Sequence, residues 1–328
     1  MKEEVVLFGT RQSLVGIVTD PATVSAQRAR TAVILLNAGI VHRVGPGRIY
    51  VKIARALAAM GFVVLRFDFS GIGDSTVRHD HLRFEKSAVA EAQEAMGVLN
   101  ATRGVEHFIF LGGCSGAFAS FETACCDPRV VGAILINFQT PDNENAAAAP
   151  DLPIRKAAYY YWKSALFNLK SWRKLLTGKT DYGQLIRVLC FEIKRRFASK
   201  KTKTPDISRV EAGLLRLAAR RVHVVFVCSE GDPQLQDLRD AGGHTLKQLC
   251  ASGEVVLDII PQSDHTFSSV YDQERLLKVA CQRMGTIRHY AASRSESTTA
   301  GERTSSCQLG QPLPILTAGA NSPQGKEL

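Results

Sequence analysis

Short runs of β-branched and aromatic residues recur along the chain, and helix-length segments separate most of them. Neighbouring parallel strands need long crossover connections, so this alternation predicts a mostly parallel sheet with helices on both faces. The first two runs lie close enough to form a hairpin at one edge. The predicted strands lie near Val5 and Val15 and at residues 32–36, 62–67, 107–111, 130–136, 222–227 and 254–260.

The long interval between the sixth and seventh of these runs breaks the rhythm. Residues 155–196 have the pattern of amphipathic helices that carry aromatic residues between basic ones. We therefore predict a core in two parts, residues 1–141 and 206–288, with a basic helical cap at 142–205 over the ends of the strands. A solvated helical insertion that never contacts a substrate fits the same segment.

The basic residues are concentrated in that cap. The chain has a net charge of +10, and residues 151–205 hold fourteen Lys and Arg against three acidic residues. Such a local excess indicates a surface that faces an anionic partner, either an anionic or lipid-like acyl substrate or a membrane surface contacted peripherally. Because no nucleic-acid-reading module accompanies the charge, we expect no nucleic-acid partner.

Several features of composition bound the location and the cofactors. The N-terminal MKEEVVLFG lacks the basic-then-apolar order of a signal peptide, and no apolar run approaches the roughly 18 residues of a membrane-spanning helix, so we expect a cytoplasmic protein. The eight cysteines show no zinc-type pairing, and no dinucleotide or Walker fingerprint is present, so we expect reduced thiols, no metal and no cofactor. Residues 289–328, rich in Ser, Thr, Gly, Pro and Gln, are predicted to form a disordered C-terminal tail.

The stretch around Cys114 joins a predicted strand to a predicted helix. Gly112 and Gly116 stand two residues before and two after it. A sharp strand-to-helix elbow needs small neighbours, because its central residue is strained and other backbone packs close to it. Cys114 is therefore a candidate nucleophile at the carboxyl edge of the sheet. Ser115 is the competing candidate, although it would lie one residue past the tip, and a small turn with a purely structural role remains an alternative.

The sequence Gly112-Gly113-Cys114-Ser115-Gly116 resembles the G-x-S-x-G elbow of the α/β-hydrolase superfamily, in the G-x-C-x-G form of dienelactone-hydrolase-like members. Residues 35–39 and 66–75 resemble the serine-aminopeptidase and monoacylglycerol-lipase-like branch. There, H-G-x follows the third strand, where this chain has Asn37-Ala38-Gly39, and R-x-D-x-x-G-x-G-x-S follows the fourth. The resemblance implies an α/β-hydrolase fold and an oxyanion hole, which we assign to the backbone amides of Gly39 and Ser115.

A weaker similarity indicates the kind of gene cluster in which such a chain occurs. Residues 42–46 and 66–75 resemble segments of bacterial hydrolases associated with exosortase or exopolysaccharide systems. This similarity implies an exopolysaccharide-associated locus and does not name a substrate.

Two later loops supply a base and an acid. Asp232 follows the strand at 222–227, and His265 follows the strand at 254–260. The chain order Cys114, Asp232, His265 matches the superfamily order of nucleophile, acid and histidine. A turn or helix cap explains Asp232 equally simply, a surface position explains His265, and Glu230 is a substitute for the acid.

These residues together predict a hydrolase that cleaves an ester, thioester or related acyl bond through a Cys-His-Asp triad and a covalent acyl-enzyme. Two other functions fit the same residues. An acyltransferase would use the same site with an acceptor other than water, and a non-catalytic protein of this fold would use its basic cap to hold an anionic partner.

Overall fold

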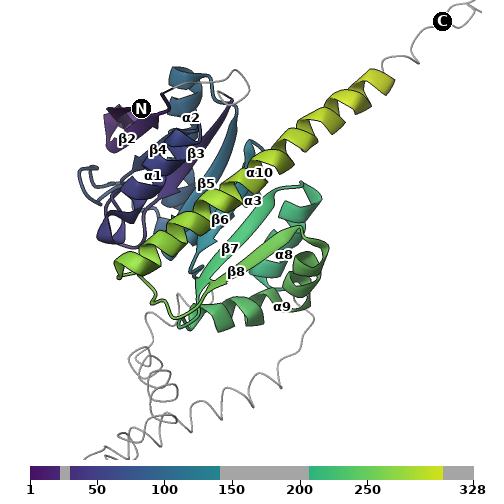
Figure 1. Cartoon of the computed structure of the whole chain (residues 1–328). Coiled ribbons are helices and arrows are strands. Elements are labelled where there is room, and N and C mark those ends of the chain that lie inside the picture. The colour runs from purple at the N-terminus through teal and green to yellow at the C-terminus, as the bar shows by residue number, and fades with distance from the viewer. Residues whose placement is uncertain (23–29, 141–206, 306–328) are drawn as a thin grey trace, which may run out of the picture.

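The computed structural model describes residues 1–22, 30–140 and 207–305 (Figure 1). Within those residues eight strands form one sheet in the order β1-β2-β4-β3-β5-β6-β7-β8. The strands are β1 (Lys2–Phe8), β2 (Leu14–Asp20), β3 (Thr31–Leu36), β4 (Val63–Phe67), β5 (His107–Gly113), β6 (Val130–Ile136), β7 (His223–Ser229) and β8 (Val255–Ile260). Each overlaps one of the predicted strands, so the predicted fold class is confirmed.

The helices connect these strands as the alternating pattern predicts. Short 3-10 turns occur at η1 (Thr10–Gln12) and η2 (Pro46–Arg48). The α-helices are α1 (Ile49–Ala59), α2 (Phe84–Arg103), α3 (Ser115–Cys126), α8 (Arg209–Ala219), α9 (Gln234–Ser252) and α10 (Val270–Ser305). Strands β1 and β2 form the expected antiparallel hairpin, β2 also runs antiparallel to β4, and every other neighbouring pair is parallel.

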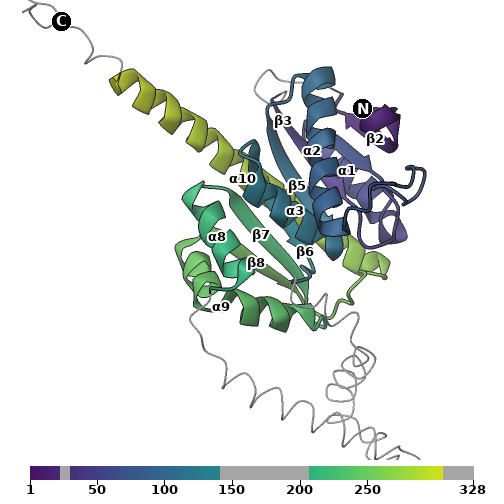
Figure 2. The same ribbon diagram turned by 180° about the vertical axis from the view of Figure 1, so that it is seen from behind.

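The parallel strands are buried on both faces, which explains their continuous apolar runs. In β3, Ile34 and Leu36 join the core beneath α2, α3, α8 and α9. These helices lie on the side of the sheet that faces the viewer in Figure 2. Val33 and Leu35 alternate to the opposite core, which α1 and α10 cover. Two hydrophobic layers therefore fix the central strands in place.

The strand register brings the carboxyl ends of the central strands into line. Gly113 at the end of β5 lies opposite Ile136 of β6, and Ile136 lies opposite Val227 of β7. Ser229 of β7 lies opposite Ile260 at the end of β8. The loops after β5, β6, β7 and β8 therefore gather at one edge of the sheet, where open parallel sheets carry their sites.

The C-terminal part differs from the prediction. The predicted tail at 289–328 begins inside α10, whose helical backbone continues through Ser305. Its polar composition suggested disorder, but residues 289–305 include alanine, arginine and glutamate, and extending a helix that is already nucleated costs little. The rest of that tail and the predicted cap at 142–205 lie outside the described residues.

In the described part of the chain, no helix is both long enough and apolar enough to cross a membrane.

Candidate active site

Cys114 occupies a sharp turn between β5 and α3. Its backbone angles are φ 53° and ψ −118°, a conformation that non-glycine residues rarely adopt. Close packing explains why both predicted elbow glycines are needed. A Cβ on Gly116 would lie 2.2 Å from the carbonyl oxygen of Asn37, and one on Gly112 would lie 2.2 Å from the carbonyl oxygen of Gly116. A larger residue at either position would therefore push α3 away from the backbone that it packs against.

The structure brings the three predicted residues Cys114, His265 and Asp232 together. His265 Nδ1 lies 2.5 Å from Asp232 Oδ2, and the Asp232 side chain is only 2% exposed whereas that of His265 is 41% exposed. The imidazole of His265 also lies near the Cys114 side chain and interacts with it. Cys114 Sγ lies 3.4 Å from Gln139 Oε1, an acceptor that the sequence analysis did not identify. One side of His265 thus faces a buried carboxylate and the other faces sulfur.

This arrangement changes the protonation of the imidazole. The hydrogen bond to Asp232 and the neighbouring Cys114 raise the pKa of His265 to about 10, although partial burial of the ring acts in the opposite direction. His265 therefore carries a positive charge at neutral pH. A protonated imidazole beside a cysteine stabilises negative charge on its sulfur.

Asp232, rather than Glu230, is the acid that contacts the histidine. The second carboxylate oxygen of Asp232 accepts from the Gln234 amide at 3.0 Å, where α9 begins, so Asp232 also closes a local turn. Glu230 instead accepts from the backbone amide of Gln262 at 3.0 Å. The Asp232 side chain therefore has two roles: one oxygen bonds the amide at the start of α9, and the other bonds His265.

The two amides assigned to an oxyanion hole lie beside the elbow. Ser115 is the first residue of α3, so its N–H belongs to the first turn, whose amides have no acceptor within the helix. The Gly39 amide donates a hydrogen bond of 2.9 Å to Ser115 Oγ. The Ser115 hydroxyl therefore occupies the Gly39 donor, and it would have to rotate away before that amide could bind another oxygen.

Asn137 ties the end of β6 to two other loops and was not identified from the sequence. Its side-chain amide donates to the His265 carbonyl at 2.7 Å, and its Oδ1 accepts from the Ser229 amide at 2.8 Å. Its backbone lies at φ 45°. Asn137 therefore sets the position of the His265 loop relative to β7.

Tyr50 performs a similar task on the other side of the elbow. Its buried hydroxyl donates to the Leu36 carbonyl at 2.9 Å and accepts from the Gly113 amide at 2.8 Å. Burial raises the pKa of this phenol well above its ordinary value, so it remains protonated and able to donate. Tyr50 thus joins the end of β3 to the residue immediately before Cys114.

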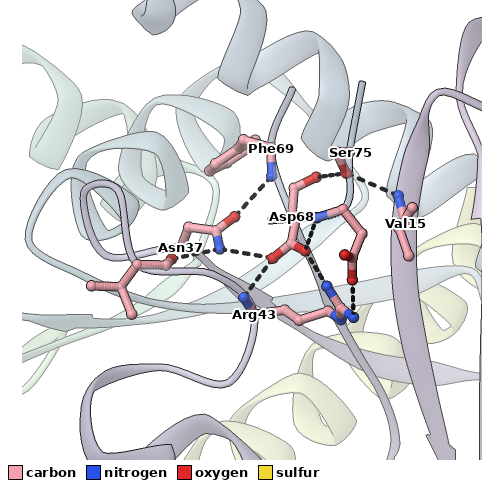
Figure 3. A network of polar contacts seen from close by, with 8 residues as sticks. Val15, Asn37, Arg43, Asp68, Phe69 and Ser75 are labelled. Carbon is pink, nitrogen blue, oxygen red and sulfur yellow. Dashed lines mark hydrogen bonds and ion pairs between the residues drawn. The ribbon is translucent and has the colours of Figure 1, made fainter. Parts of the chain in front are cut away.

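A polar network holds the loop that contains Gly39 (Figure 3). Asn37 Oδ1 accepts from the Phe69 amide, and Asn37 Nδ2 donates to the Val41 carbonyl, each at 2.9 Å. The fully buried carboxylate of Asp68 accepts from the Arg43 backbone amide at 2.5 Å and from the Arg43 guanidinium. The Asn37 side chain thus fastens the loop after β3 to the loop after β4.

This architecture is similar to that of several solved structures. No protein-family model and no curated protein matches the sequence. Among solved structures, a hypothetical protein of Pseudomonas aeruginosa is similar over 88% of this chain and 94% of its own, with TM-score 0.56 and 13% identity. An α/β hydrolase from Penicillium sp. sh18 matches over 89% of this chain and all of its own, with TM-score 0.54 and 16% identity.

A dienelactone hydrolase from Anabaena variabilis is similar over 86% of this chain and 95% of its own, with TM-score 0.51 and 14% identity. The chain has the α/β-hydrolase fold. In this α/β-hydrolase fold, Cys114 lies at the strand-to-helix elbow, and Asp232 and His265 follow β7 and β8. At these identities the similarity establishes the fold, and the chemistry of the site must be argued from its own geometry.

Proposed function

We propose that the protein is a hydrolase that cleaves an ester, thioester or related acyl bond, with Cys114 as its nucleophile. The observation that carries this proposal is the hydrogen bond between His265 and the buried Asp232, beside Cys114 at the tip of the elbow. A nucleophile held against a base that a third group orients is the arrangement that covalent acyl transfer requires. Several neighbours of the same fold are named as esterases or hydrolases, which agrees with this assignment.

Acylation would start from the Cys114 thiolate and the His265 imidazolium. The sulfur attacks the substrate carbonyl carbon, and the carbonyl oxygen becomes an oxyanion that the amides of Ser115 and Gly39 can stabilise once the Ser115 hydroxyl turns away. When the tetrahedral intermediate collapses, the bond to the leaving group breaks and His265 gives its proton to that group. Asp232 holds the ring so that Nε2 faces the reacting atoms.

Deacylation would use the same histidine in the opposite direction. In the thioester intermediate the sulfur is no longer charged, so one of the two contacts that raise the pKa of His265 is lost. The neutral imidazole then takes a proton from water, and the water oxygen attacks the thioester carbon. The carbon–sulfur bond breaks, which releases the acid and restores the thiolate. An acceptor other than water would give acyl transfer at the same site.

Thiol alkylation tests whether this site activates its cysteine. Iodoacetamide at neutral pH is expected to modify Cys114 faster than the exposed Cys126, because among the cysteines that the structure describes only Cys114 lies beside a protonated imidazole. Burial raises the pKa of Cys125 and of Cys228 to about 12, so these two thiols should react slowly. Peptide mapping by mass spectrometry after timed labelling gives each rate.

Two variants in one loop sharpen this test. Asp232→Asn removes the charge that raises the pKa of His265, so Cys114 labelling should slow by about tenfold. Glu230→Gln is the matched control, because Glu230 bonds the Gln262 amide and should leave the rate within about twofold. Equal labelling of Cys114 and Cys126, or equal effects of the two variants, would contradict an activated thiol.

A further inference from the structure

A cavity of about 430 Å³ lies between the loop after β3, helix α1 and strand β4. Four arginines line it, together with a single carboxylate, Asp74. Neither Cys114, Asp232 nor His265 belongs to its wall, so the cavity is separate from the candidate active site. The lining arginines are Arg43, Arg48, Arg55 and Arg66.

The carboxylates that balance these arginines are placed mostly outside the cavity wall. Arg43 pairs with Asp68 and Asp74, and Arg55 pairs with Glu3 at 2.8 Å. Arg66 reaches the same Glu3 at 3.5 Å. Glu3 and Asp68 do not line the cavity, so Asp74 is the one carboxylate among the lining residues.

Arg66 is the most deeply buried of the four. Its side chain, on β4, is only 5% exposed, and its Nε has no hydrogen-bond partner among the described residues. The Nε of Arg43 is likewise buried without one. Desolvation lowers the pKa of Arg66, and the positive charges of Arg43 and Arg55 lower it further. A bound anion would stabilise these crowded charges.

Arg48 lines the same cavity and is exposed to solvent. Its backbone has a left-handed conformation with φ 63°. Gly45 and Gly47, with φ 72° and 53°, make the turn that precedes it. Within the described part of the chain Arg48 pairs with no carboxylate, so its guanidinium is available to a ligand.

We propose that this cavity binds the phosphate group of a small molecule. Guanidinium groups are planar donors that match phosphate oxygens, and several of them converge here from a loop, a helix and a strand. The volume falls within the range of small-molecule sites and exceeds what a single phosphate fills, so an organic phosphate or a diphosphate fits best. A concave wall that contains the buried Arg66 favours such a ligand over a flat polyanionic surface.

Calorimetric titration of the full-length protein with pyrophosphate, and separately with inorganic phosphate, tests this proposal. We expect saturable binding of one pyrophosphate per chain, and binding at least about tenfold weaker in Arg48→Ala. Arg83→Ala is the matched control, since Arg83 is 82% exposed and does not line the cavity, and it should bind as the wild type does. Cys114→Ala should also bind normally, which separates this site from catalysis.

Arg66→Met provides a second variant inside the wall. It should bind pyrophosphate at least about tenfold more weakly and should lose the rise in melting temperature that the ligand gives to the wild type. If Arg66→Met does not fold, Arg48→Ala alone decides. The proposal is wrong if the wild type shows no saturable binding, or if Arg83→Ala weakens binding as much as Arg48→Ala does. The latter result would mean that pyrophosphate responds only to total charge.

Discussion

Cys114→Ala and His265→Ala are each expected to lower the turnover of a short p-nitrophenyl ester and of an acyl thioester by about 10³-fold or more. Alanine at 114 removes the sulfur that would form the acyl-enzyme, and alanine at 265 removes the only imidazole that contacts that sulfur among the described residues. Because the two side chains act in one step, the double variant should lose little beyond either single variant. Initial rates measured at matched protein concentration give the comparison.

Two further variants test whether the loss of turnover is specific to Cys114. Cys126→Ala removes an exposed thiol outside the site and should leave turnover unchanged. Ser115→Ala should lose far less than Cys114→Ala, because it keeps the backbone amide and removes the hydroxyl that occupies the Gly39 donor. An inactive Ser115→Ala beside an active Cys114→Ala would assign the nucleophile to Ser115 and overturn the proposed mechanism.

Gly116→Ala is expected to destabilise the fold by about 3 kcal/mol or more. The added Cβ would lie 2.2 Å from the Asn37 carbonyl oxygen and 2.6 Å from that of Leu36, and both are backbone atoms, one in the loop after β3 and one at the end of β3 itself. Neither can rotate aside as a side chain could, so α3 or the end of β3 must move. Urea denaturation followed by circular dichroism measures the loss in the free energy of unfolding.

Gly97→Ala is the matched control for this substitution. Gly97 lies within α2, and a Cβ there would meet nothing within 4 Å. The same chemical change should therefore raise stability by roughly 0.5–1 kcal/mol, because alanine favours a helix over glycine. A Gly116→Ala protein as stable as Gly97→Ala would show that α3 is not held against β3.

The alternating pattern determines the sheet because each buried strand is a short apolar run separated from the next by a polar or glycine-containing turn. Helix α2 shows what the pattern leaves open: it ends at Arg103 because Gly104, at φ 65°, follows it, and the apolar pattern alone does not fix that end. At α10 the predicted end of the helix came too early. The sequence of the last turns has no apolar repeat, and these turns extend a helix that has already formed, so periodicity alone does not predict them.

The candidate triad was predictable because each member directly follows a strand whose carboxyl end reaches the same edge of the sheet. The supporting residues were not predictable in this way. Asn137 contacts the His265 carbonyl across 128 residues of sequence, and Tyr50 contacts the Gly113 amide across 63. Both side chains bond backbone atoms. Every type of residue can supply such atoms, so the sequence does not reveal the partner. The contact between Gly39 and Ser115 is hidden for the same reason.

Detection of the acyl-enzyme tests the central claim most directly. The full-length protein would be mixed with a p-nitrophenyl ester, quenched in acid during turnover and analysed as intact mass and as peptides. The account predicts a mass increase of one acyl group on the peptide that contains Cys114, released by hydroxylamine and absent from Cys114→Ala. An acyl group on Ser115, or full ester turnover by Cys114→Ala, would contradict it.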